Sequence, residues 1–166
     1  MSRILIVDDS PPARSLIRAI VTLDGHNVSE AATGEEALAA LAGERFDLMI
    51  LDLVMPGVDG YQVLEQLRAM PGREDMPVIA ISDQEEAIDA IRSSQLGALD
   101  HLPKPFGYDQ MEKSIKRILE ATPEQIIELR EAKLAQAEEY KKVIDLVDEA
   151  KAPRRGFFRR ARAARR

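Results

Sequence analysis

The stretch DLMILD, residues 47–52, decides the fold. It is continuously apolar at its centre and ends at Asp52, as expected of a strand covered on both faces of a sheet. Two other short apolar runs resemble it, ILIV at 4–7 and PVIAI at 77–81. We therefore expect three buried strands at these positions.

The segments between these strands have helical spacing of apolar residues. We expect helices over residues 11–23, from Thr33 or Gly34 onward, and over 61–70, 85–96 and 109–121. A weak strand is expected at 27–31 and a short one at 99–102. Strand and helix thus alternate five times, which predicts an α/β fold with a five-stranded parallel sheet and helices on both faces.

Chemically active side chains follow four of the expected strands. Asp8 and Asp9 end the first strand, Asp52 the third and Ser82 the fourth, while Lys104 follows the fifth. Ligands of such sheets bind outside the carboxyl ends of the strands, so these side chains are expected to converge. Three carboxylates suit Mg²⁺, one of them can act as a nucleophile that forms an aspartyl phosphate, and a lysine can offset the charge.

Other roles compete for some of these residues. Asp8 or Asp9 also suits the N-cap of the helix at 11–23, and a single aspartate can do both. Asp52 can be a turn acid, Ser82 an ordinary helix cap and Lys104 a solvated lysine, although Pro103 and Pro105 constrain the loop around Lys104.

Four strings of the sequence, in order and with matching spacing, are similar to the response-regulator receiver family. The resemblance covers about residues 2–121 and rests on ILIVDDS (4–10), LMILDLVMPGVDGYQVL (48–64), PVIAIS (77–82) and GALDHLPKPF (97–106). It implies a flavodoxin-like fold with strand order 2-1-3-4-5. It also implies a role in two-component signal transduction, with a sensor histidine kinase or phosphotransfer protein as phosphoryl donor.

The resemblance assigns the parts of the phosphorylation site. Asp52 matches the phospho-acceptor, which with Asp8, Asp9 and the backbone carbonyl of Val54 is expected to hold Mg²⁺. Lys104 matches the lysine that binds the phosphoryl group. The bond between Lys104 and Pro105 is expected to be cis.

The residues expected to read out phosphorylation depart from the family pattern. Ser82 matches the switch hydroxyl, but the switch aromatic, commonly Tyr or Phe, is His101, which can equally be a packed or surface histidine. Asp83 replaces a small residue and is expected to point to solvent. Aspartyl-phosphate phosphatases carry a second acid where Val54 stands, so the chain is expected to be a phosphoryl acceptor and not an enzyme.

The amino-acid composition changes after residue 121. Thr122 and Pro123 suit a helix N-terminus, and residues 123–151 contain no further Gly or Pro, which predicts one long helix. Its heptad pattern is partial, because Arg130 and Lys141 fall at seam positions. This segment, 122–152, is expected to form a homodimer contact, to cover the receiver surface, or to link to an output domain.

The last segment, residues 153–166, is strongly basic. It holds seven Arg and no acid, so the remaining residues carry a charge of −13 within a net charge of −6. We expect it to be disordered when alone, with three alternatives: binding of an anionic membrane through Phe157 and Phe158, binding of nucleic-acid phosphate, or a solvated tail that docks on the acidic body.

The sequence thus predicts a receiver domain at 1–121, with output through protein–protein contacts. The alternative is a phosphorylation-gated binder of membrane or nucleic acid through residues 153–166. There is no cysteine, no apolar run of eighteen residues and no secretion signal. A cytoplasmic location is therefore expected, peripheral at the membrane under the alternative.

Overall fold

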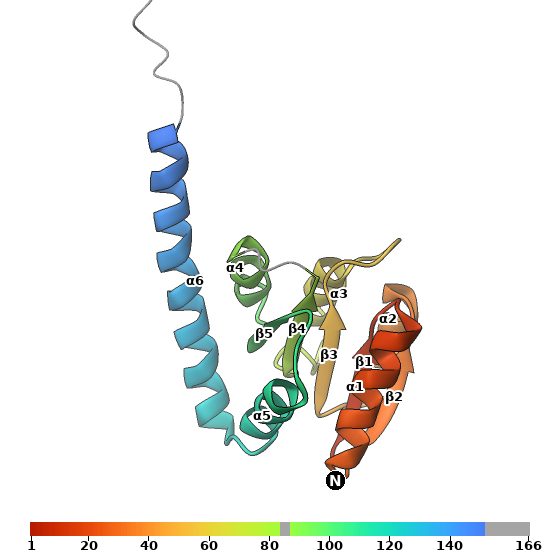
Figure 1. Ribbon diagram of the computed structural model, residues 1–166. Coiled ribbons are helices and arrows are strands. Elements are labelled where there is room, and N and C mark those ends of the chain that lie inside the picture. The colour runs from red at the N-terminus through yellow and green to blue at the C-terminus, as the bar shows by residue number, and fades with distance from the viewer. Residues whose placement is uncertain (84–86, 152–166) are drawn as a thin grey trace, which may run out of the picture.

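The computed structural model describes residues 1–83 and 87–151 (Figure 1). The strands are β1 Arg3–Val7, β2 Asn27–Ala31, β3 Leu48–Asp52, β4 Val78–Ser82 and β5 Asp100–Pro103. The helices are α1 Pro11–Leu23, α2 Gly34–Gly43, α3 Gly60–Arg68, α4 Ala87–Gln95, α5 Tyr108–Leu119 and α6 Pro123–Lys151. The expected alternation of five strands and five helices, followed by a long helix, is confirmed.

The five strands form one parallel sheet in the order β2-β1-β3-β4-β5, as predicted. Successive residues of a strand point to opposite faces. In β3, Leu48 and Ile50 enter one core cluster, while Met49 and Leu51 enter the other. All four side chains are fully buried, which explains why the central strand is apolar without interruption.

Helices cover both faces of the sheet. Residues of α1 and α5, including Ile17 and Ile115, pack with Ile50 on one face. Residues of α2 and α3, including Leu41 and Leu64, pack with Leu51 on the other. The sheet is thus held between two apolar layers, and its carboxyl-terminal edge is left to polar residues.

Helix boundaries lie within two residues of those expected, and caps explain the shifts. The helix expected from residue 61 begins at Gly60, because the Asp59 side chain accepts a hydrogen bond from the Gln62 amide. The expected start of α4 at residue 85 lies outside the described residues. The peptide bond between Lys104 and Pro105 is cis, as predicted.

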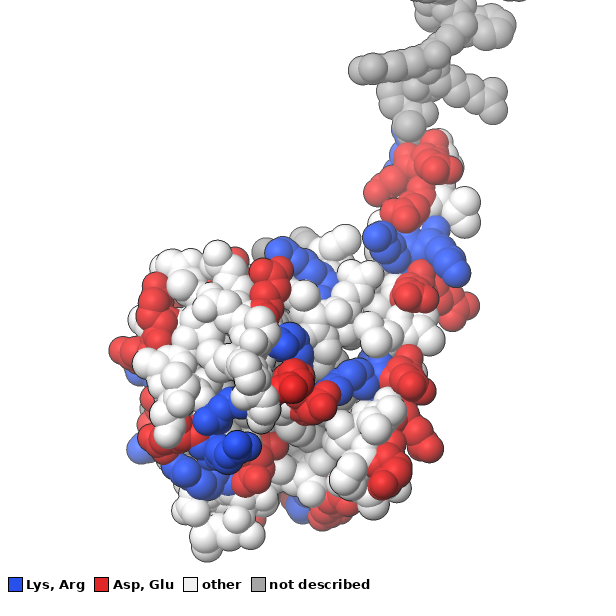
Figure 2. All heavy atoms as spheres, turned by 180° about the vertical axis from the view of Figure 1, so that it is seen from behind, with Lys and Arg blue, Asp and Glu red and all other residues white. Residues whose placement is uncertain are grey.

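Helix α6 is 29 residues long, as expected, and packs chiefly against α4 (Figure 1). Thr122 caps it: its hydroxyl accepts from the Gln125 amide, and the Gln125 side chain accepts from the Thr122 amide. Acidic and basic side chains are interspersed along the helix in Figure 2. The segment 153–166, predicted to be disordered, lies outside the described residues. Nowhere in 1–83 or 87–151 is a helix both long and apolar enough to span a bilayer.

Candidate functional site

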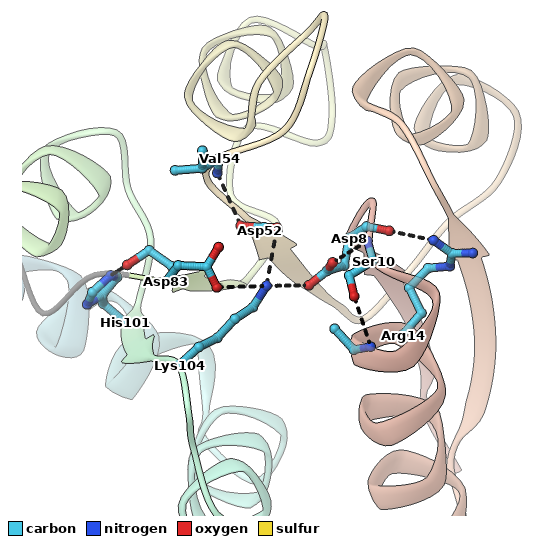
Figure 3. Close-up of polar contacts among 10 residues, drawn as sticks. Asp8, Ser10, Arg14, Asp52, Val54, Asp83, His101 and Lys104 are labelled. Atoms are coloured by element: carbon cyan, nitrogen blue, oxygen red, sulfur yellow. Dashed lines mark hydrogen bonds and ion pairs between the residues drawn. The ribbon is translucent and has the colours of Figure 1, made fainter.

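Three aspartates meet at the carboxyl edge of the sheet, as predicted. Figure 3 shows two of them, Asp8 and Asp52. β1 and β3 are neighbours with Val7 opposite Leu51, so the residues that follow lie side by side. Asp8, Asp9 and Asp52 each offer a carboxylate oxygen, and these atoms lie within 4.8 Å of one another. Asp8 and Asp52 are almost completely buried, whereas Asp9 is exposed.

Lys104 reaches into this group from the loop after β5. Its Nζ lies 2.9 Å from Asp8 Oδ2 and 3.3 Å from Asp52 Oδ2. A third carboxylate, Asp83 Oδ1, is 3.7 Å away, so it turns toward the site, although its side chain is largely exposed and was expected to point to solvent. Lys104 therefore partly offsets the negative charge of the buried acids in this structure.

The loop after β1 is held by contacts that the sequence did not reveal. Ser10, and neither Asp8 nor Asp9, is the N-cap of α1, with its hydroxyl accepting from the Ala13 amide. The Ser10 amide donates to Asp8 Oδ1 at 2.8 Å, and Arg14 donates to the Asp8 carbonyl oxygen at 2.8 Å. Ser10 directly before Pro11 was an available cap signal, but no local pattern marks Arg14.

The loop after β3 orients Asp52. The Val54 amide donates to Asp52 Oδ1 at 3.1 Å, while the Val54 side chain is exposed. Gly60 allows α3 to begin close to this loop, because a Cβ at Gly60 would lie 2.2 Å from the Asp52 carbonyl oxygen. One carboxylate oxygen of Asp52 thus has a backbone partner and the other faces Lys104.

Burial and the neighbouring charges together set the pKa values of the two central groups. Burial raises the pKa of Asp52 to about 6, against the opposing effects of Lys104 and the Val54 amide. Burial alone would lower the pKa of Lys104, but the carboxylates of Asp8, Asp52 and Asp83 together raise it above its usual value. At neutral pH the site therefore holds a carboxyl group whose pKa is only slightly below the pH, beside an amine that stays protonated.

The two expected switch residues are in contact. Ser82 ends β4 one residue after Ile81, which pairs with Asp52, and its Oγ lies 2.9 Å from His101 Nε2. The Lys104 amide donates to the Ser82 carbonyl oxygen at 2.7 Å. Burial lowers the pKa of His101, which favours a neutral ring that carries one proton on either nitrogen.

The donor set fits Mg²⁺. The clustered atoms are all carboxylate oxygens, the ligands that this ion prefers, and one contributor is exposed, which leaves a side open for water or phosphate oxygens. Asp8, Asp9 and Asp52 would hold it. Together the carboxylates, the lysine and the nearby hydroxyl form a site suited to receiving a phosphoryl group.

Comparison with known sequences agrees with this geometry. A family model described as the response regulator receiver domain matches residues 4–116. Response regulator MprA of Mycolicibacterium vanbaalenii is 33% identical over 120 residues, which cover 72% of this chain and 51% of that protein. The chain spans about half the length of the curated relatives it matches.

Comparison with solved structures also finds receiver domains. The signal receiver domain of a signal transduction histidine kinase from Syntrophus aciditrophicus is 32% identical, with a TM-score of 0.68, and the match covers 74% of this chain and 93% of that one. The receiver domain of sensor histidine kinase PA1611 from Pseudomonas aeruginosa PAO1 is 28% identical, with a TM-score of 0.68 over 72% of this chain and 98% of that one. That structure has a magnesium ion coordinated in its active site cleft.

Proposed function

Since the chain belongs to the response-regulator receiver family, we propose that Asp52 is its phospho-acceptor. A receiver domain acts as a phosphoryl acceptor and not as a classical enzyme, and it implies a cognate histidine kinase. The acidic pocket of Asp8, Asp9 and Asp52 with Lys104 fits acceptance by an aspartate. The observation that carries the proposal is the buried Asp52 carboxylate, 3.3 Å from Lys104 Nζ at the end of the central strand.

The reaction transfers a phosphoryl group from the phosphohistidine of the donor protein. A carboxylate oxygen of Asp52 forms a bond to phosphorus while the phosphorus–nitrogen bond breaks, and the donor imidazole leaves with the electron pair. Lys104 places a positive charge beside the phosphoryl oxygens, and Ser82 donates a hydrogen bond to one of them. Mg²⁺, when bound by Asp8, Asp9, Asp52 and the Val54 carbonyl, supplies further positive charge.

The proposal predicts that a small phosphoryl donor labels the protein only with Mg²⁺. With acetyl phosphate and Mg²⁺, intact-mass spectrometry should show one added phosphoryl group. With excess chelator the label should disappear, because repulsion between the carboxylates and the phosphate would be unscreened. Labelling that proceeds equally with chelator would contradict the assigned metal ligands.

Val54 predicts a long-lived phosphorylated state. Its exposed side chain is apolar and lies beside Asp52, so it cannot orient a water molecule for attack on phosphorus. We expect Val54→Asn to shorten the lifetime severalfold in a decay assay after removal of acetyl phosphate. Leu23→Asn, which changes an exposed apolar residue at the C-terminal end of α1, is the matched control. An unchanged lifetime in Val54→Asn would show that this side chain does not limit hydrolysis.

We propose protein–protein contacts as the output, with residues 1–121 as the receiver and α6 as an added regulatory element. A second candidate function rests on the seven Arg of residues 153–166, which suit anionic lipid or nucleic-acid phosphate. Binding of the full chain and of a chain ending at Ala152 to anionic vesicles and to DNA separates these candidates. Equal binding by both chains would remove the second candidate.

A further inference from the structure

We propose that docking of α6 and phosphorylation of Asp52 stabilise the same conformation of the receiver. The docked helix favours the phosphorylated state, and phosphorylation tightens the docking. Helix α6 docks on the α4–β5 face, meaning the surface of residues 87–95 and 100–103. The inference rests on the proposed function of Asp52 and adds a regulator of that site within the same chain.

The first half of α6 is fixed to the body by apolar and charged contacts. Ala137 is 3% exposed, and Ile126 and Leu129 pack against the core on the α1–α5 side of the sheet. Arg130 Nη1 lies 2.7 Å from Asp75 Oδ1, and Lys133 Nζ lies 3.4 Å from Asp100 Oδ1. These contacts hold α6 over β5, where the switch histidine lies.

His101 stands between the phosphorylation site and α6. On one side its Nε2 contacts Ser82 Oγ at 2.9 Å. On the other side the residue lines a cavity of about 190 Å³ whose walls include Ile91 of α4 with Lys133 and Ala137 of α6. A change in the position of the imidazole ring therefore changes the contacts between the α4–β5 face and α6.

The Ser82 hydroxyl has a single proton to donate. Before phosphorylation it can donate to His101 Nε2 or accept from it. Once it donates to a phosphoryl oxygen on Asp52, its oxygen can only accept from the histidine. His101 then has to carry its proton on Nε2 and to remain inward, as in this structure.

The docked helix makes the outward position of His101 unfavourable. An outward ring would leave Ser82 for a cavity whose walls include Ile91, Ala137 and the cationic side chain of Lys133. With α6 removed, water would solvate that same position and the penalty would fall. Docked α6 therefore favours the inward ring that the phosphorylated site requires.

The coupling is reciprocal by thermodynamic linkage. If docked α6 favours the phosphorylated state by a given factor, phosphorylation favours docking by the same factor, and such factors are typically about 5- to 150-fold. We therefore expect amide hydrogen exchange in residues 126–140 to slow about fivefold or more upon phosphorylation. Hydrogen exchange with and without acetyl phosphate and Mg²⁺, with the phosphorylated fraction measured by intact mass, tests this.

Two variants test the route of the coupling. Ala137→Arg places a cation in the buried contact and should undock α6, lowering the phosphorylated fraction at subsaturating acetyl phosphate because the competent state is less populated. Ala150→Arg makes the same change at an exposed site of the same helix and should have no effect. His101→Ala removes the link to Ser82, so phosphorylation should no longer slow exchange in α6.

The outcomes separate the inference from the proposed function. Slower exchange in α6 at high Asp52 labelling, lost in His101→Ala, supports the coupling. Unchanged or faster exchange at the same labelling overturns it and leaves Asp52 as the acceptor. A chain that takes no label with Mg²⁺ present overturns both.

Discussion

Asp52→Asn is expected to abolish labelling by acetyl phosphate and by a phosphorylated histidine kinase. The amide retains the shape of the side chain but is a poor nucleophile and a weaker ligand for Mg²⁺. Removal of an enzyme's nucleophile lowers its rate by a factor on the order of 10⁴ or more, so the label should fall below detection. Asp8 and Asp9 remain in this variant and offer the phosphoryl group its nearest alternative carboxylates.

The matched control for this variant is Asp145→Asn, which makes the same change at an exposed position of α6. It should be labelled like the unaltered chain. Circular dichroism of both variants establishes that the fold is retained. Full labelling of Asp52→Asn would exclude Asp52 as the acceptor.

The same substitution is expected to stabilise the fold at neutral pH when divalent cations are absent. Burial raises the pKa of Asp52 from 3.8 to about 6, so the folded state holds a proton that the unfolded state releases between these values. Stability is therefore lost as the pH rises through this window. A pKa difference of this size lowers the free energy of unfolding of the unaltered chain by at most about 3 kcal/mol above pH 7. The Asp52→Asn variant has no carboxyl group to ionise, so it does not lose this stability.

Urea unfolding at pH 4 and pH 8 with chelator measures this effect. The free energy of unfolding of Asp52→Asn should match that of the unaltered chain at pH 4 and exceed it at pH 8. Asp145→Asn should change neither value, since its side chain is exposed. A destabilised Asp52→Asn at pH 8 would mean that the contacts of the carboxylate with Lys104 and Val54 outweigh the penalty of burying it.

The sheet and its site were predictable because both depend on short local patterns. Leu48 to Leu51 must be apolar to be buried on both sides, and a parallel sheet brings the residues after β1 and β3 together whatever the loops contain. The convergence of Asp8, Asp9 and Asp52 followed from this topology.

The docking of α6 was not predictable, because it depends on tertiary contacts. Lys133 and Asp100 are far apart in the sequence and meet only once α6 folds back along α4. The partial heptad pattern favoured docking or a loose pair over a tight zipper, but it did not say where the helix would dock. The contact of His101 with Ser82 also needed coordinates, since either a buried or an exposed ring suits that sequence position.

The most direct test of the account is to locate the phosphoryl group in the unaltered chain. After labelling with acetyl phosphate and Mg²⁺, reduction of the acyl phosphate with borohydride and peptide mass spectrometry identify the modified residue. We expect modification of Asp52, with none at Asp8 or Asp9. Reduction found at Asp8 or Asp9, with Asp52 unmodified, would contradict the assignment of Asp52 as the acceptor.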